Sequence, residues 1–334
     1  MNEVKKKEIG YFLIKCILFL FILFILDFGI GSLLKNFYFK QQSGLLYRTT
    51  YSIDSTNADI LIFGSSTGNH DYYPNAFEKR LNMSCYNTGR DGLGIFYFYA
   101  VLKGVLKRYS PKIVVLDFNP VEFIKSQRDY DRITALLPYY DNHPELRSII
   151  QLKSPFEKYK LISKIYPFNS LIFTIAGGNL AFNKDRELNK DEKGYVPLSE
   201  IWKGPVVYDT FSVKYELDYN KINMFKSFIT DCINSNIKLY IFLSPKYEKF
   251  DDEEQSVMIA QKIAKKHGIP FYDFTYNSLF QKNKNLFADE GHLNDNGAKI
   301  YTEMVIDKII QNQSQFNSNV DTIIPINHYS TIRK

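Results

Sequence analysis

The chain has 334 residues, a net charge of +6, 45% hydrophobic residues, 23% charged residues and 16% aromatic residues. Burying so many apolar side chains can offset the entropy of chain ordering, which excludes an intrinsically disordered protein. Its 42 basic and 36 acidic residues are interspersed, which excludes nucleic acid as the expected partner, and three scattered cysteines exclude a disulfide scaffold. The mean hydropathy of −0.25 excludes a membrane protein of many spans but allows one span.

The N-terminal segment predicts a membrane-spanning helix. Lysines at positions 5–7 precede an apolar run over residues 11–34, and 24 helical residues extend about 36 Å. That length crosses a hydrocarbon core of roughly 30 Å with some tilt. Lys15 can snorkel back toward the other lysines, and we expect Asp27 near the far interface.

The lysine cluster also predicts the topology. Under the positive-inside rule the N-terminus is cytoplasmic, and the chain after about residue 35 lies outside the cytoplasm. A cleaved signal peptide and a buried soluble helix are the alternatives, and residues 29–31 are the nearest approach to a cleavage site. We therefore expect residues 1–35 to form a cytoplasmic tail and a single-pass anchor, and residues 36–56 to form a linker.

The rest of the chain alternates between strand-like and helix-like runs. Buried strands are predicted where short β-branched or apolar runs end in turn residues, and helices where apolar residues recur at helical spacing. The predicted strands cover residues 58–63, 84–87, 112–118, 237–243 and 270–274, and the predicted helices cover 73–81, 95–108, 219–234, 253–267 and 294–310. Strands separated by helices imply a parallel sheet in a three-layer α/β/α sandwich, here over residues 57–310.

This alternation stops between residues 121 and 218. A structureless loop of that length is improbable in a compact domain, so we expect a helical insert that caps the sheet, with a peripheral decoration as the alternative. Its aromatic side chains fit a local core better than a sugar-stacking surface. Residues 311–334 are expected to form a poorly ordered C-terminal tail.

Two motifs carry candidate catalytic groups. The first predicted strand ends in GSSTGNH, residues 64–70, where Ser66 would present its hydroxyl at the start of a helix. The second motif is DEGH, in which Asp289 can orient His292 from three residues away, as a general base for a serine requires. Either motif alone also fits an ordinary turn or helix cap.

Two further turns follow predicted strands on the same sheet edge, where ligands bind in open parallel sheets. The turn NTGRDG follows the second strand and contains Gly92, and DFNP follows the third and contains Asn119. A backbone N–H and a side-chain amide are the donors that an oxyanion hole needs.

The order of these four motifs resembles the SGNH, or GDSL-like, hydrolase superfamily. The resemblance covers residues 58–119 and 237–310 and implies a flavodoxin-like five-stranded sheet. It implies Ser66 as the nucleophile and as a backbone oxyanion donor, Gly92 and Asn119 as the other donors, and His292 with Asp289 as the rest of the triad. The chain departs from the family pattern in GSS and in DFNP. Asn69 and His70 would either line this site or cap the next helix.

The resemblance implies a serine-dependent ester hydrolase or O-acyltransferase outside the cytoplasm, acting on acyl groups such as acetyl on cell-envelope polysaccharide. The expected partners are an acylated polysaccharide or other ester, the membrane, and an acyl-donating membrane protein. No cofactor or metal is expected, because the sequence has no ligand spacing of the HExxH kind. The alternative is a non-catalytic envelope scaffold or carbohydrate-binding protein that retains the fold.

Overall fold

A computed structural model describes residues 3–180, 192–205, 216–247 and 254–321. A single sheet lies at the centre of the body, and its strands are all parallel. The strand order is β2-β1-β3-β4-β5. The bounds are β1 Ile60–Phe63, β2 Cys85–Asn87, β3 Ile113–Asp117, β4 Lys238–Leu243 and β5 Phe271–Asp273. The prediction of a five-stranded parallel α/β sheet is thereby confirmed.

The sheet is buried on both faces because its strands are apolar at successive positions. Every residue of β1 and β3 is buried. Leu61 and Phe63 belong to one hydrophobic cluster, whereas Ile60 and Ile62 belong to another. This alternation is the consequence of side chains that point to opposite faces at successive positions of a strand.

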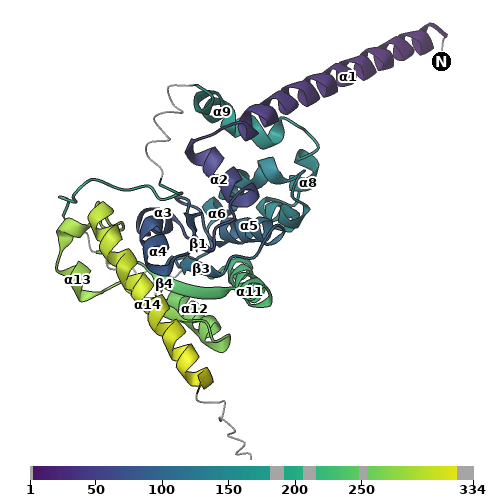
Figure 1. Ribbon diagram of the computed structural model, residues 1–334. Coiled ribbons are helices and arrows are strands. Elements are labelled where there is room, and N and C mark those ends of the chain that lie inside the picture. Colours follow the sequence, from purple (N-terminus) through teal and green to yellow (C-terminus); the bar gives the residue numbers. More distant parts are fainter. Residues whose placement is uncertain (1–2, 181–191, 206–215, 248–253, 322–334) are drawn as a thin grey trace, which may run out of the picture.

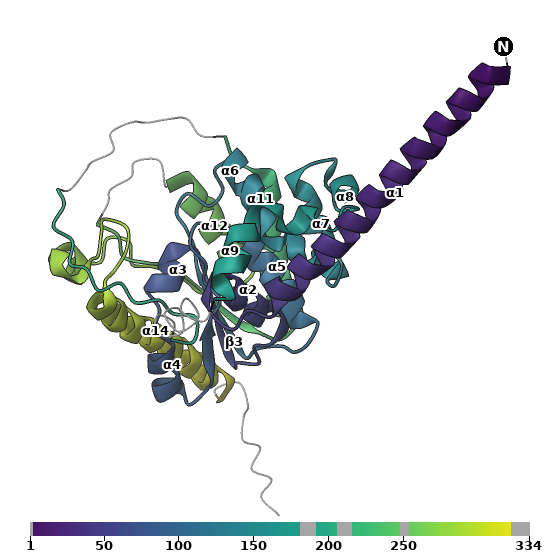
Figure 2. The ribbon, with the colours of Figure 1, turned by 90° about the horizontal axis from the view of Figure 1, so that it is seen from above.

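Each hydrophobic cluster is completed by its own helices (Figures 1 and 2). The larger cluster includes residues of α2 (Gly44–Asp54), α5 (Ile95–Leu106), α11 (Tyr219–Asn234) and α12 (Glu254–Lys266). The other includes residues of α4 (Pro74–Leu81), α13 (Ser278–Gln281) and α14 (Asp295–Asp321). A five-residue helix, α3 (Ser66–His70), connects β1 to this second side.

The region between β3 and α11 consists of short helices. Among the described residues these are α6 (Gln127–Arg132), η1 (Ile133–Tyr139), η2 (Pro144–Leu146), α7 (Arg147–Ile150), η3 (Gln151–Lys153), α8 (Glu157–Lys160), η4 (Tyr166–Leu171) and α9 (Ile172–Gly178). Residues of η1, α7, η4 and α9 join the larger cluster. Residues 181–191 and 206–215 of the expected insert lie outside the described part.

A short 3-10 turn, η5 (Lys284–Leu286), precedes α14.

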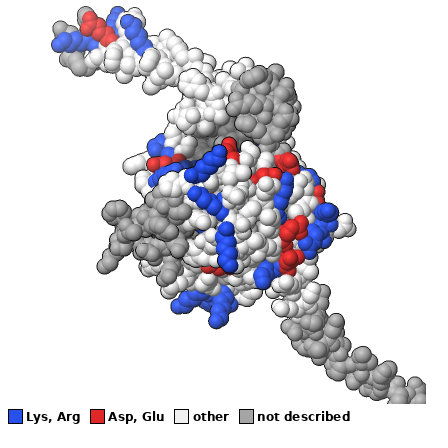
Figure 3. All heavy atoms as spheres, turned by 90° about the vertical axis from the view of Figure 1, so that its left-hand side faces the viewer, with Lys and Arg blue, Asp and Glu red and all other residues white. Residues whose placement is uncertain are grey.

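The chain begins with one long helix, α1 (Glu3–Phe39), that projects from the body (Figure 1). Its stretch Lys7–Phe39 is long and apolar enough to cross a membrane, which is compatible with a single-pass anchor or a signal sequence. In Figure 3 the charged side chains of α1 gather toward its free end, and the body shows Lys, Arg, Asp and Glu side by side.

Two expected boundaries differ from the structure. Residues 36–56 are not an extended linker, because α1 continues to Phe39 and α2 buries Leu46 and Ile53 against the larger cluster. Residues 311–321 are not part of a poorly ordered tail, because α14 continues to Asp321, and residues 322–334 of the expected tail lie outside the described part. Both segments are polar in sequence, which predicted irregular structure. The first is instead helical because its apolar side chains pack against the body, and the second because α14 continues through it.

Candidate active site

The GSS motif forms a tight connection between β1 and α3. A Cβ atom on Gly64 would lie 2.7 Å from the Cα of Gly68 and 2.8 Å from the Cβ of Asp117. Only glycine allows the end of β1 to approach α3 this closely. Ser66 is the first residue of α3, so its hydroxyl lies at the carboxyl edge of the sheet and is partly exposed.

The structure brings Ser66, His292 and Asp289 together. The Nε2 atom of His292 lies 2.6 Å from Ser66 Oγ, and its Nδ1 lies 2.8 and 3.0 Å from the two carboxylate oxygens of Asp289. A carboxylate only accepts hydrogen bonds, so it selects the tautomer that carries a proton on Nδ1. The Nε2 lone pair then faces the Ser66 hydroxyl and can accept its proton.

The Asp289 carboxylate favours the ionised form. Partial burial raises the pKa of Asp289, but hydrogen bonds from the ring and backbone of His292 and from the Gly291 N–H outweigh burial, and the pKa lies below its usual value. An ionised carboxylate at this distance stabilises the positive charge that His292 acquires when it takes a proton.

Asn69 and His70 connect α3 to the turn that contains Gly92. Asn69 Nδ2 donates to Asp91 Oδ1 at 2.7 Å, and His70 Nε2 lies 3.2 Å from Asp91 Oδ2. Arg48 of α2 donates to Asn69 Oδ1 at 2.9 Å. Burial raises the pKa of Asp91, but the bonds from His70 and Asn69 and the charge of Arg48 outweigh it and lower the pKa to about 2.

His70 also lies against the candidate base. Its ring meets the His292 ring edge to face, with centroids 5.9 Å apart, and its Nδ1 lies 2.6 Å from the carbonyl oxygen of Val196. The sequence allowed Asn69 and His70 either to line the site or to cap the next helix. In the structure both side chains are buried between α3 and the Asp91 turn.

Gly92 adopts a left-handed backbone conformation with φ of 70°. The guanidinium of Arg132, from α6 in the insert, donates a hydrogen bond to the Gly92 carbonyl. None of the hydrogen bonds among the described residues uses the Gly92 N–H. The Gly92 turn is therefore held from both sides, by Asp91 and by Arg132, while its N–H has no partner in the described part of the chain.

Asn119 lies two residues after the end of β3 and forms a short turn, in which its Oδ1 accepts from the Val121 N–H at 3.1 Å. Its amide nitrogen donates no hydrogen bond among the described residues. Ser65, Gly92 and Asn119 are among the residues that line a pocket of about 330 Å³. Ser66 is not itself a lining residue of that pocket, although its neighbour Ser65 is.

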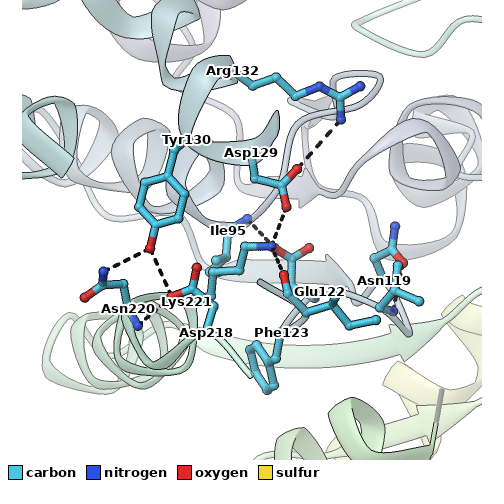
Figure 4. Close-up of polar contacts among 12 residues, drawn as sticks. Ile95, Asn119, Glu122, Phe123, Asp129, Tyr130, Arg132, Asp218, Asn220 and Lys221 are labelled. Carbon is cyan, nitrogen blue, oxygen red and sulfur yellow. Dashed lines mark hydrogen bonds and ion pairs between the residues drawn. The ribbon is translucent and has the colours of Figure 1, made fainter. Parts of the chain in front are cut away.

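A wall of charged residues also lines the pocket, and Figure 4 shows Glu122, Asp129 and Lys221 close together. Lys221 of α11 donates to Asp129 and, at 2.7 Å, to the carbonyl of Ile124. Glu122 accepts from the Ile95 N–H at 2.7 Å, and burial raises its pKa to about 7 against the opposing effect of Lys221. Such a wall suits polar ligand groups and disfavours a long apolar chain.

Two buried carboxyl groups beneath the site were not predicted. Asp71 Oδ1 accepts from the Leu293 N–H at 3.1 Å, which ties the residue after His70 to the residue after His292. Asp117 accepts from Thr67 of α3, from Tyr72 and from Ser244. Burial raises the pKa of both carboxyl groups. Asp117 belongs to the DFNP motif, so its position in that motif was the available signal, whereas nothing local distinguishes Asp71.

Among the described residues, no group of three or more His, Cys, Asp or Glu side chains could hold a metal ion. Models of known protein families give no match to the chain, and curated proteins give none either.

Proposed function

We propose that the protein is a serine-dependent ester hydrolase or O-acyltransferase of the SGNH type. The observation that carries the proposal is the continuous chain of hydrogen bonds from Ser66 Oγ through His292 to Asp289. Ser66 is more than 220 positions from Asp289 and His292 in the sequence, and the three residues meet at the carboxyl edge of a parallel sheet. A hydroxyl, a base and an orienting carboxylate in this order form a nucleophile that is activated by proton transfer.

The arrangement of the sheet supports the same proposal. The order β2-β1-β3-β4-β5 is that of flavodoxin-like doubly wound folds, in which ligands bind beyond the carboxyl ends of the strands where the order reverses. Two hydrophobic clusters with their own helices fit a three-layer α/β/α sandwich. Strand order and motif order together favour the SGNH superfamily, although fold alone does not establish chemistry.

In the proposed reaction, His292 Nε2 takes the proton from Ser66 Oγ as that oxygen attacks the carbonyl carbon of an ester. The N–H groups of Ser66 and Gly92 and the amide of Asn119 donate to the oxyanion that forms. His292 then gives the proton to the departing alcohol, which leaves an acyl group on Ser66. Water releases the acid by the reverse sequence, or a sugar hydroxyl accepts the acyl group.

The pocket beside the oxyanion donors favours a small acyl group and a hydroxylated substrate. Its charged wall, with Glu122, Asp129 and Lys221, offers hydrogen-bonding partners to sugar hydroxyls and a poor environment for a fatty acyl chain. We therefore propose acetyl or a similarly short acyl group on an envelope polysaccharide as the substrate.

We also propose that α1 remains in the mature protein as the membrane anchor, with a cytoplasmic N-terminus. Asp27 accepts from Ser163 Oγ and from the Lys164 and Ile165 N–H groups, at 2.5, 2.7 and 3.3 Å. Cleavage near residues 29–31 would remove this acceptor and leave three donors of the body without it. The catalytic body would then lie outside the cytoplasm, where a membrane protein could deliver an acyl donor.

Labelling by a fluorophosphonate, which reacts with activated serines, tests the assignment. The Ser66→Ala variant should lose all labelling and all turnover of p-nitrophenyl acetate. Ser65→Ala is the matched control, because Ser65 lies next in the chain and makes no side-chain cap hydrogen bond, so labelling should persist. Labelling of a folded Ser66→Ala protein would contradict the proposal, and a folded wild-type protein without turnover of any acyl donor would favour the scaffold alternative.

A further inference from the structure

The insert presents three large apolar side chains to the exterior along one short segment. Phe156, Tyr159 and Ile162 are 66%, 60% and 72% exposed. They recur every third residue, with Tyr159 in α8, Phe156 at its N-cap and Ile162 in the turn that follows it. Figure 2 shows α8 on the side of the body from which α1 projects. Exposed apolar groups at this spacing mark a contact surface and not part of the core.

The α8 segment is held in place from beneath. The carboxylate of Glu157 is fully buried and accepts from the hydroxyl of Tyr166 at 2.5 Å and from Lys160 at 3.3 Å. Leu161 is buried in the larger hydrophobic cluster. The three exposed side chains therefore face outward from a fixed element.

Contacts to Asp27 fix the level of this segment along α1. Ile162 directly precedes the residues that donate to the Asp27 carboxylate, and a Cβ atom on Gly31 would lie 2.3 Å from the backbone of Lys164. From Lys7 to Asp27 the helix rises about 30 Å, which equals the thickness of a hydrocarbon core. Lys7 and Asp27 thus lie one hydrocarbon thickness apart along α1, and Asp27 is hydrogen-bonded to the turn after α8.

Lysines surround the apolar side chains. Lys158 and Lys160 are exposed on α8, and the backbone N–H of Lys164 donates to Asp27. The ammonium groups of Lys160 and Lys164 pair with Glu157 and Asp141 at 3.3 and 2.8 Å. A cavity of about 160 Å³ between α1 and the insert is lined mostly by apolar side chains, with Lys35, Lys164 and Asp141 among the polar ones. Aromatic and aliphatic groups with lysines around them are the composition of segments that lie in a membrane interface.

We propose that Phe156, Tyr159 and Ile162 insert into the headgroup region of the bilayer that α1 crosses, and that the neighbouring lysines contact lipid phosphates. The segment is a second membrane contact of the body and fixes its orientation on the lipid surface. A single helix would allow the body to rotate and tilt, whereas two contacts hold the candidate active site in one orientation relative to the membrane. This inference rests on the proposed anchor but not on the proposed chemistry.

Tryptophan fluorescence in the full chain tests the proposal. The chain has one tryptophan, Trp202, so probes are introduced in a Trp202→Phe background. Phe156→Trp reports on the α8 segment, and Leu20→Trp, 63% exposed in α1, reports on the span. Met258→Trp is the matched control, because Met258 is 60% exposed on α12, away from α1 (Figure 1). Each variant is reconstituted into phosphatidylcholine and phosphatidylglycerol vesicles with and without brominated acyl chains, which quench nearby indoles.

We expect bromolipid to quench Phe156→Trp clearly, less than Leu20→Trp and well above Met258→Trp, with emission at shorter wavelength than the control. If Phe156→Trp behaves like Met258→Trp while Leu20→Trp is quenched, the second contact is wrong and the anchor stands. Such a result would mean that water or another protein covers the α8 segment. If Leu20→Trp is not quenched either, the anchor itself is wrong and the second contact is refuted with it.

Discussion

Replacement of Gly92 by alanine tests whether the Gly92 turn supplies an oxyanion donor. Gly92 has φ of 70°, and a Cβ atom there would lie 2.7 Å from Nη2 of Arg132. Alanine in the left-handed region costs about 1–2 kcal/mol. Displacement of Arg132 also weakens its hydrogen bond to the Gly92 carbonyl, and bonds to charged groups contribute about 1.5–3 kcal/mol. Because this arginine is partly exposed, we expect a total loss of about 2–4 kcal/mol in the free energy of unfolding.

The same substitution should lower catalysis much more than stability alone explains. A shifted turn misplaces the Gly92 N–H, and removal of one oxyanion donor typically lowers kcat by about 10²–10³-fold. Gly268→Ala is the matched control, since Gly268 has φ of 68° and nothing within 4 Å of the added Cβ. The control should lose about 1–2 kcal/mol of stability with unchanged kcat.

Urea unfolding and p-nitrophenyl acetate turnover of the folded variants measure the two effects. If Gly92→Ala retains the wild-type kcat, the Gly92 N–H is not an oxyanion donor. If both variants lose the same stability, Arg132 does not hold the turn.

Two further outcomes follow from the titratable groups. Asp289→Asn should lower kcat by about 10⁴-fold, because an amide can stabilise the wrong tautomer of His292. The fold should persist, because the Asp289 side chain is 54% exposed. Near wild-type turnover of this variant would show that Asp289 does not belong to the triad. Burial raises the pKa of Glu122 from 4.5 to about 7, so the folded chain keeps a proton that the unfolded chain releases as the pH rises between these values. The free energy of unfolding should therefore fall by about 3 kcal/mol from pH 4.5 to 7 relative to Glu122→Gln, and identical urea-unfolding profiles for the two proteins would contradict this coupling.

Much of the sheet could be predicted from the sequence because its signals are local. The apolar runs that end at Phe63, Asp117 and Leu243 are long enough to identify buried strands, and turn residues mark where they end. Ser66 and His292 could be proposed as a pair because parallel strands bring their carboxyl ends to one edge. The sequence could not say whether the two side chains point at each other, since that depends on the path of a chain segment that separates them by 226 positions.

Other features were decided by tertiary contacts that leave no local pattern. The helix α2 lies in a polar stretch, but it buries Ile53 and delivers Arg48 to Asn69. Arg132 reaches the Gly92 carbonyl across 40 positions, from an insert whose helices are too short for a clear periodicity. Such short helices are stabilised by packing and not by their own propensity.

The sequence by itself determined the apolar span, the strands and the order of the four motifs, because hydrophobic period and turn chemistry act over a few residues. The tertiary structure decided which side chains meet at the carboxyl edge of the sheet. It also decided that the insert bonds to Asp27 of α1 and how Asp71 and Asp117 support the site from below. These are contacts between residues distant in the chain, and only the packing of the whole body sets their geometry.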